Sequence, residues 1–193
     1  MKPKIILASG SPTRKKIAKR IGLKFKIIPS NFVEDMSLNL SPEELAMELA
    51  YGKAEDVARN LREGIVIGID TFIYFNGNII GKPKDKEDAY KILISLSNNV
   101  HFIYSGIALI DIKNKKIIKD FEVTKVKFRD LDDYEINKYI DSGEPMNKAG
   151  AYAIQEKGDI LIERIEGCYL NIAGFPYNKI IKGLKKLGVK EFE

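Results

Sequence analysis

Two kinds of side chain in this sequence suit reactions of phosphate groups. Carboxylates stand at Glu34, Asp35 and Asp70, and lysines stand at Lys53 and Lys82. Carboxylate oxygens are ligands that Mg²⁺ prefers, and lysine ammonium groups bind phosphate oxygens as point charges. Together they favour a metal-assisted attack of water on a phosphate ester or anhydride.

Cysteine and histidine add little to this chemistry. Cys168 is the single cysteine, so an intramolecular disulfide and a multi-cysteine zinc site are excluded. His101 is the single histidine, which removes paired-histidine metal motifs and leaves a serine triad dependent on one base. We expect His101 to be a partly buried strand residue. Any metal must therefore be held by oxygen ligands.

Asp70 stands where a buried strand is predicted to end. Val66–Ile69 is a short apolar run, typical of a strand buried on both faces. Asn76-Gly77 tolerates the positive φ angles of a tight hairpin turn, and symmetric pairing about it places Thr71 opposite Lys82. We therefore expect Asp70 and Lys82 near one another. The alternative is that Asp70 caps a turn and Lys82 is a solvated surface lysine.

The first predicted strand and helix form a junction suited to anions. A strand over Lys4–Ala8 leads through a Ser-Gly-Ser-Pro turn into a helix over Thr13–Ile21. Such a junction directs unpaired N–H groups and the positive end of the helix dipole outward. The polar and basic side chains around it are Ser9, Ser11, Arg14, Lys15 and Lys16. No Walker loop or G-x-G-x-x-G motif is present, so the junction is either an ordinary capped helix or a phosphate site.

Lys53 falls within the apolar stripe of a longer predicted helix. Ser41 and Glu44 form a capping box at its start, and the helical pattern continues to about Arg62. Lys53 lies four residues from both Leu49 and Val57 of the stripe, so it should face inward. Two interpretations stay open. The ammonium either extends to water beyond a packed stem or points into an anion-binding cleft.

The remaining segments indicate a mixed α/β fold. In chain order they are a strand over Lys24–Pro29, a helix capped by Asp85, extended runs over Val100–Ile112 and Ile117–Phe128, a helix over Asp132–Ile140, a loop over Gly143–Gly150, strand-like runs over Ala151–Gln155 and Ile160–Ile165, a further run over Gly167–Phe175, and a last helix opened by Pro176. Hairpins and alternating helices predict a mixed sheet flanked by helices. No separable linker interrupts residues 1–193, which we interpret as one domain or two closely joined lobes.

Composition narrows the function classes. The 193 residues are 45% hydrophobic, contain no run of eighteen apolar residues and begin with no secretory apolar segment, so we expect a cytoplasmic protein without a membrane partner. The formal charge of +5 is modest, and no motif interleaves lysines with exposed aromatic residues. We therefore expect an anionic small ligand rather than nucleic acid.

Five separated motifs resemble the signatures of the Maf family. They are Leu7–Arg14 (LASGSPTR), Lys53-Ala54, Ile67–Thr71 (IGIDT), Gly81–Pro83 (GKP) and Gly143–Gln155 (GEPMNKAGAYAIQ). The resemblance covers nearly the whole chain and implies a nucleoside triphosphate pyrophosphatase that uses a divalent cation, Mg²⁺ or Mn²⁺. It also implies a two-lobed fold with a cleft between the lobes, similar to that of inosine-triphosphate pyrophosphatases, and a homodimer. The family is associated with removal of noncanonical nucleotides and with cell-division arrest.

The resemblance also assigns roles to individual residues. Asp70 would accept the proton of the attacking water and bind metal, with Glu34 as a second metal ligand. The residues that would hold the phosphates are Ser9, Ser11, Arg14, Lys53 and Lys82. Thr71 and Gln155 match positions associated with substrate choice, and the Ala-Ile-Gln sequence at 153–155 resembles the branch that acts on dTTP and UTP.

Two positions depart from the family pattern. Thr13 replaces the first of two arginines, which removes a planar bidentate donor and would alter base or phosphate recognition. Asn147 replaces an aspartate, which is a milder change. Thr13 favours a rival function, a nucleotide-sensing or partner-binding protein that keeps the pocket with little turnover. Asp70, Lys53 and Lys82 oppose that rival.

Overall fold

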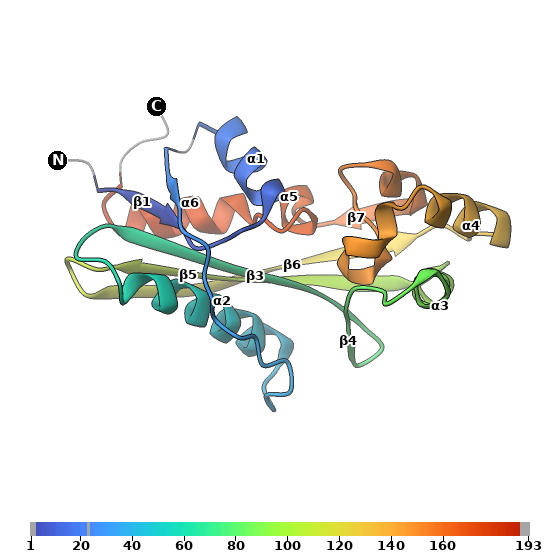
Figure 1. The fold of residues 1–193 in the computed structure, drawn as a ribbon, viewed down its shortest axis with the longest axis horizontal. Coiled ribbons are helices and arrows are strands. Elements are labelled where there is room, and N and C mark those ends of the chain that lie inside the picture. Colours follow the sequence, from blue (N-terminus) through green and yellow to red (C-terminus); the bar gives the residue numbers. More distant parts are fainter. Residues whose placement is uncertain (1–2, 23, 190–193) are drawn as a thin grey trace. The chain divides into compact units, whose positions relative to one another are not determined.

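The computed structural model describes residues 3–22 and 24–189 as a mixed α/β protein (Figure 1). Its described strands are β1 (Ile5–Leu7), β2 (Lys26–Ile27), β3 (Ile65–Phe75), β4 (Asn78–Ile80), β5 (Val100–Asp111), β6 (Lys116–Phe128) and β7 (Ile162–Glu166). Its described helices are α1 (Pro12–Arg20), α2 (Pro42–Ala58), α3 (Lys86–Leu96), α4 (Asp133–Asp141), α5 (Tyr169–Ile172) and α6 (Tyr177–Lys186), with the short 3₁₀ helices η1 (Glu144–Asn147), η2 (Ala149–Ala151) and η3 (Lys157–Leu161).

The strands form an open mixed sheet, as the sequence predicts. Their order is β2-β1-β3-β5-β6-β7, and β4 pairs with β3 outside this path. The pairs β1–β2 and β1–β3 are parallel, whereas β3–β4 and β6–β7 are antiparallel. The chain divides into two compact units. Unit 1 holds the described residues up to Thr71, Ser105–Glu122 and those from Gly174 on, and unit 2 holds Phe72–Tyr104 and Val123–Ala173.

In unit 1, helices cover both faces of the strands. A side chain at Gly68 of β3 or Gly106 of β5 would collide with the backbone of α2, so these glycines let the helix lie directly on the sheet. Gly183 of α6 lies against Leu109, which is three residues from Gly106 and therefore points to the opposite face. The small apolar core beneath α2 includes Ile6, Ala8, Ala50, Ala54, Val57, Val66 and Ala108.

Unit 2 has its own, more aromatic core. Helices α3 and α4 and the 3₁₀ helices pack around strand residues such as Ile103, Val126 and Phe128, all of which are buried. His101 is fully buried there, beyond the partial burial that the sequence predicts, and its Nε2 lies 2.8 Å from the Tyr152 hydroxyl. The aromatic rings of Phe128 and Tyr152 surround the imidazole edge to face. Packing against apolar rings explains the complete burial.

The capping and turn signals of the sequence are confirmed. Ser11 caps α1, Ser41 and Glu44 form the capping box of α2, and Asp85 caps α3. The hairpin turn at Asn76-Gly77 has φ angles of 47° and 81°, and its pairing of Ile73 with Ile80 is the predicted register. Local hydrogen bonds and backbone angles set these features, which is why sequence patterns reveal them.

Several segment predictions are wrong. β3 does not end at Asp70 but continues to Phe75, because an ion pair compensates the buried carboxylate and the chain needs no turn there. Residues 151–155 form no strand but lie in η2 and a turn, since Gly150 and Ala151 have positive φ angles. The run 167–175 contains α5 rather than a strand, α2 stops at Ala58 instead of near Arg62, and β2 is two residues long.

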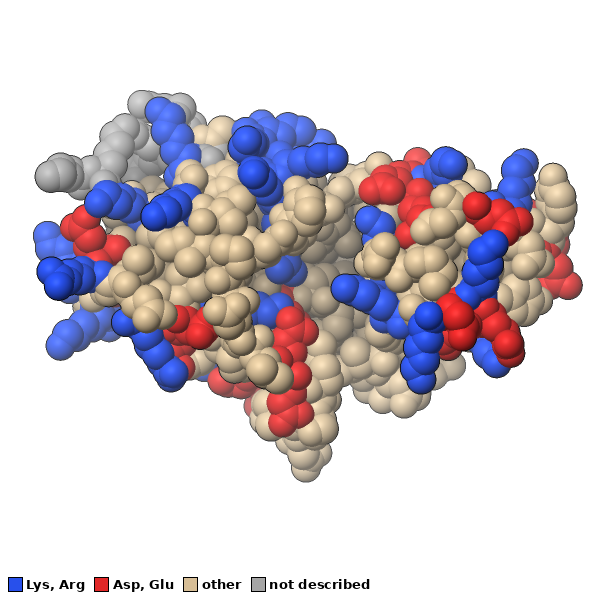
Figure 2. All heavy atoms as spheres, in the orientation of Figure 1, with Lys and Arg blue, Asp and Glu red and all other residues tan. Residues whose placement is uncertain are grey.

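Basic side chains are dispersed among acidic ones on the face shown in Figure 2. The densest group of Lys and Arg on this face covers α1, whose exposed basic residues are Lys15, Lys16, Lys19 and Arg20. Among the described helices, none is both long enough and apolar enough to cross a membrane.

Candidate active site

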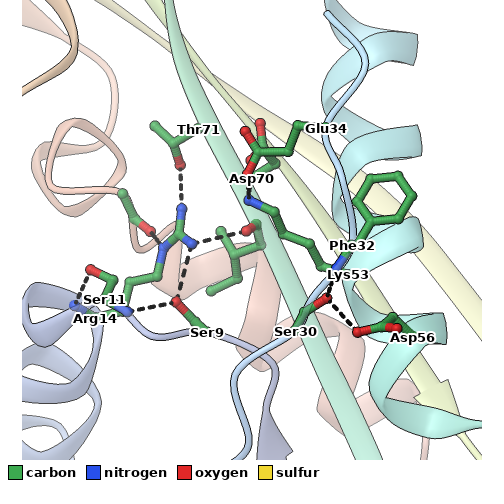
Figure 3. A network of polar contacts seen from close by, with 12 residues as sticks. Ser9, Ser11, Arg14, Ser30, Phe32, Glu34, Lys53, Asp56, Asp70 and Thr71 are labelled. Carbon is green, nitrogen blue, oxygen red and sulfur yellow. Dashed lines mark hydrogen bonds and ion pairs between the residues drawn. The ribbon is translucent and has the colours of Figure 1, made fainter. Parts of the chain in front are cut away.

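Lys53 and Asp70 form the centre of a charged site in unit 1 (Figure 3). The Lys53 ammonium lies 2.5 Å from Asp70 Oδ1, and the two side chains are 14% and 4% exposed. Gly68 precedes Asp70 on the same face of β3, and Gly68 contacts Ala50 and Ala54 of α2. The close packing of α2 against β3 therefore brings the Lys53 side chain to Asp70. Lys53 faces inward, as the helical pattern predicts.

Glu34 reaches the same ammonium from the loop between β2 and α2. Its Oε1 lies 2.6 Å from Lys53 Nζ, so one lysine is shared by two carboxylates. The start of the loop is held by Asp56 of α2, which accepts hydrogen bonds from the Ser30 hydroxyl at 2.9 Å and the Asn31 N–H at 2.8 Å. Asp35, the third carboxylate singled out in the sequence, instead accepts from Ser37 within the loop.

Asp70 keeps one oxygen without a partner. Its Oδ2 is buried and accepts no hydrogen bond from the described residues, although the residue is only 3% exposed. A buried polar atom without a partner is costly, and such atoms mark places where a ligand, water or ion is bound. Asp70 Oδ2 is therefore the natural acceptor for a group that enters this site.

Arg14 connects three segments of unit 1. Its guanidinium donates to Gly174 O at 2.8 Å, Ile69 O at 2.9 Å, Thr71 Oγ1 at 3.2 Å and Ser9 Oγ at 3.3 Å. Four of the five guanidinium N–H groups are thus engaged within the protein. Burial lowers the pKa of Arg14, and the carboxylates of Asp70 and Glu34 oppose that shift. This arginine positions the residues on either side of Asp70.

The α1 junction is arranged as the sequence predicts. Ser11 Oγ accepts a hydrogen bond from Arg14 N, and Ser9 Oγ accepts one from Ser11 N, so both hydroxyls are engaged at the start of the helix. Thr13 lies in the first turn of α1, partly buried, and its side chain makes no hydrogen bond to the described part of the chain.

Two predicted site residues belong to unit 2. Lys82 is exposed and follows β4, beyond the last paired residue Ile80. Gln155 is exposed at the third position of a turn in which Glu156 N donates to Ala153 O at 3.3 Å. Each side chain is free to meet a ligand, because neither makes a hydrogen bond or ion pair with the described residues.

Other polar residues of these networks escape sequence reasoning. Ser105 lies in the middle of β5, yet its hydroxyl is fully buried 2.7 Å from that of Thr71. Asp56 looks like one more surface carboxylate of α2, although it holds the loop that carries Glu34. A polar residue in an apolar strand is the one signal that could have revealed Ser105, and none marks Asp56.

Comparison with known proteins is consistent over almost the whole chain. A family model described as "Maf-like protein" matches residues 4–187. The chain is 50% identical over 187 residues to a dTTP/UTP pyrophosphatase of Clostridium tetani, covering 95% of this chain and 97% of that protein. It is 48% identical to proteins of the same name from Clostridium botulinum, strain Okra, and Acetivibrio thermocellus, with 96% of this chain covered in each case and 97% and 96% of those proteins.

Proposed function

This chain belongs to the family of Maf-like proteins, and on that premise we propose that it is a nucleoside triphosphate pyrophosphatase. In the proposed reaction a water oxygen bonds to the α-phosphorus of the substrate. The bond from that phosphorus to the α–β bridging oxygen breaks, and pyrophosphate leaves with the electron pair. The other product is the nucleoside monophosphate.

The observation that carries this proposal is the unpartnered oxygen of Asp70. Lys53 fixes Asp70 Oδ1, which leaves Oδ2 to accept the proton of the attacking water. A positioned general base of this kind contributes about 10²- to 10⁴-fold to a rate. Arg14 supports the base, because it ties the carbonyl before Asp70 and the hydroxyl after it to one rigid group.

Glu34 and Asp70 fit the requirements of a divalent cation. Both supply carboxylate oxygens, and Asp70 Oδ2 has two lone pairs, so one would bind the cation while the other accepts the proton of the attacking water. The described residues contain no cluster of three or more Asp, Glu, His or Cys side chains arranged for a metal. Two carboxylates suit Mg²⁺ or Mn²⁺, which are completed by water and substrate phosphates. The bound cation would neutralise charge on the transferring phosphoryl group.

Cationic and hydroxyl groups are available for the triphosphate. Lys53 has three N–H donors, so one remains for a phosphate oxygen while the other two hold Asp70 and Glu34. Lys82 offers an ammonium that is exposed in unit 2. The hydroxyls of Ser9 and Ser11 stand at the amino end of α1, where the helix dipole favours an anion.

We assign base selection to Thr71 and Gln155, as the family resemblance implies. The relatives named above act on dTTP and UTP, and we propose the same substrates for this chain. Thr13 offers one hydroxyl in the first turn of α1 where an arginine would present a planar fork of donors, so we expect weaker discrimination than an arginine would give.

The rival function, nucleotide sensing without turnover, uses the same binding residues. It predicts nucleotide binding without pyrophosphate release. The intact Lys53–Asp70 pair favours the enzyme, since a binding protein has no need for a buried carboxylate with a vacant oxygen.

A panel of nucleoside triphosphates tests the proposal. We expect the purified chain, supplied with Mg²⁺ or Mn²⁺, to release pyrophosphate from dTTP and UTP faster than from other canonical nucleotides. Release of orthophosphate would indicate a different phosphatase, and binding without hydrolysis would support the sensing function. Modified pyrimidine nucleotides in the same panel test a role in nucleotide-pool sanitation.

We also propose that the chain acts in the cytoplasm as a homodimer, as its composition and family resemblance imply. Light scattering at working concentration gives the mass in solution. A monomer mass of 21.8 kDa would contradict the dimer.

A further inference from the structure

The turn that carries Gln155 is held from several sides while Gln155 itself is free. Glu144 Oε2 accepts a hydrogen bond from Lys157 N at 3.0 Å, and Oε1 accepts one from Gly158 N at 3.1 Å. Tyr139 of α4 donates its hydroxyl to the same Oε1 at 2.7 Å and accepts from Ala153 N at 3.3 Å. These contacts lie on both sides of Gln155 in the sequence.

Close packing reinforces these hydrogen bonds. A side chain at Gly158 would collide with the Tyr139 hydroxyl and with the backbone of Ala153, so the two ends of the turn meet at the tyrosine. Tyr139 is 3% exposed, and burial together with the Glu144 carboxylate raises its pKa. The hydroxyl therefore stays a neutral donor at physiological pH.

We propose that Tyr139 and Glu144 are positioning residues that set the nucleotide selectivity of Gln155. The proposal rests on the pyrophosphatase function and on the role assigned to Gln155 above. A glutamine amide distinguishes bases by a few directional hydrogen bonds, and their strength depends on where the backbone holds the amide. Tyr139 and Glu144 restrict that backbone, so less order must be acquired when the base binds.

Neither residue is placed to touch the reacting phosphate in this proposal. Both act through the turn, and their loss should weaken the binding of preferred bases rather than the chemical step. The expected signature is a higher KM for dTTP and UTP with kcat within about twofold of the unmodified chain, because the base-binding energy is lost equally in ground and transition states.

Four variants isolate this effect. Tyr139→Phe removes only the hydroxyl, and Glu144→Gln replaces one acceptor oxygen with a donor. Gln155→Ala measures the full contribution of the glutamine. Tyr90→Phe is the matched control, because Tyr90 also donates its hydroxyl to a carboxylate, Asp133, elsewhere in unit 2.

The measured quantity is the ratio of kcat/KM for dTTP to that for dGTP, together with the ratio of the dissociation constant for dGTP to that for dTTP, measured by calorimetry. We expect Tyr139→Phe and Glu144→Gln to lower both ratios by roughly three- to tenfold, the range for one lost hydrogen bond. Tyr90→Phe should leave them unchanged. The double variant of Tyr139→Phe with Gln155→Ala should be no less selective than Gln155→Ala alone, since Tyr139 affects selectivity only through Gln155.

Three results would overturn the proposal. They are an unchanged selectivity in Tyr139→Phe and Glu144→Gln, full additivity with Gln155→Ala, and a Gln155→Ala variant as selective as the unmodified chain. If Tyr139→Phe is too unstable, Glu144→Gln and its double variant with Gln155→Ala decide alone, and if both single variants fail to fold, Glu144→Asp, which keeps the carboxylate but shortens its reach, takes their place. Absence of hydrolysis with every nucleotide would count against the proposed function. The ratio of dissociation constants would still test the positioning role of Tyr139 and Glu144.

Discussion

Asp70 in unit 1 and Glu144 in unit 2 are both carboxylates within hydrogen-bond networks, but the networks differ in completeness. Asp70 has one oxygen on Lys53 and one without a described partner. Glu144 uses both oxygens, on the Tyr139 hydroxyl and two backbone N–H groups. A saturated carboxylate fixes the shape of the chain, whereas one with a vacant oxygen can take up a proton or a cation.

The largest expected effect comes from replacing Asp70, the carboxylate that has an oxygen without a described partner. Asp70→Asn should reduce pyrophosphate release from dTTP by about 10²- to 10⁴-fold, because the amide cannot act as a base. Glu144→Gln should change kcat by no more than about twofold. Both are measured under saturating substrate, with circular dichroism to verify folding. Equal losses of kcat would show that the two carboxylates do not have separate roles.

The next effect concerns stability. Lys53→Met leaves the buried Asp70 carboxylate without its cation, so we expect the free energy of unfolding in urea to fall by about 3–5 kcal/mol. Adding Asp70→Asn to the same chain should restore part of the loss. Lys119→Met is the control, since it breaks a more exposed pair with Glu48 of α2. A Lys53→Met variant as stable as this control would mean that the central pair contributes no more than a surface pair.

His101 offers a further comparison with Asp70. Its buried Nδ1 also lacks a partner among the described residues, but its imidazole ring is neutral, whereas Asp70 is a charged group paired with Lys53. Burial lowers its pKa from 6.5 to about 4. Between these values the unfolded chain binds more protons than the folded one, so stability falls as pH decreases. We expect the loss from pH 7 to pH 4 to be about 3 kcal/mol smaller in His101→Phe, measured by urea unfolding at each pH. Parallel pH profiles of the unfolding free energy for the unmodified chain and His101→Phe would contradict the lowered pKa of His101.

The sequence predicts local features well and distant contacts poorly. Caps, the hairpin turn and the inward face of α2 depend on residues a few positions apart. The sequence presents Lys53 and Asp70 only as two separate candidates. Their contact depends on how closely α2 packs against Gly68 of β3, which no local pattern reveals. Asp70 looks like a strand end, since an isolated carboxylate does not reveal that a lysine 17 positions earlier compensates it.

The errors after Gly143 have a related cause. Residues 151–155 have the composition of a strand, but the turn is stabilised by Tyr139 and Glu144, whose roles are set by tertiary contacts. Phosphate binding by Arg14 stays a prediction, and the structure adds hydrogen bonds from its guanidinium to the carbonyls of Gly174 and Ile69. No periodicity distinguishes an arginine that binds a ligand from one that binds carbonyl groups.

The bond from Arg14 to Gly174 has a consequence for synthesis on the ribosome. The two residues are 160 positions apart, and Gly174 follows the last residue of unit 2, Ala173. A nascent chain therefore contains all of unit 2 before it contains the Gly174 carbonyl, which accepts a hydrogen bond from Arg14. Because domains tend to fold as units during translation, unit 2 can become native while Arg14, at the beginning of the chain, still lacks the Gly174 carbonyl among its partners.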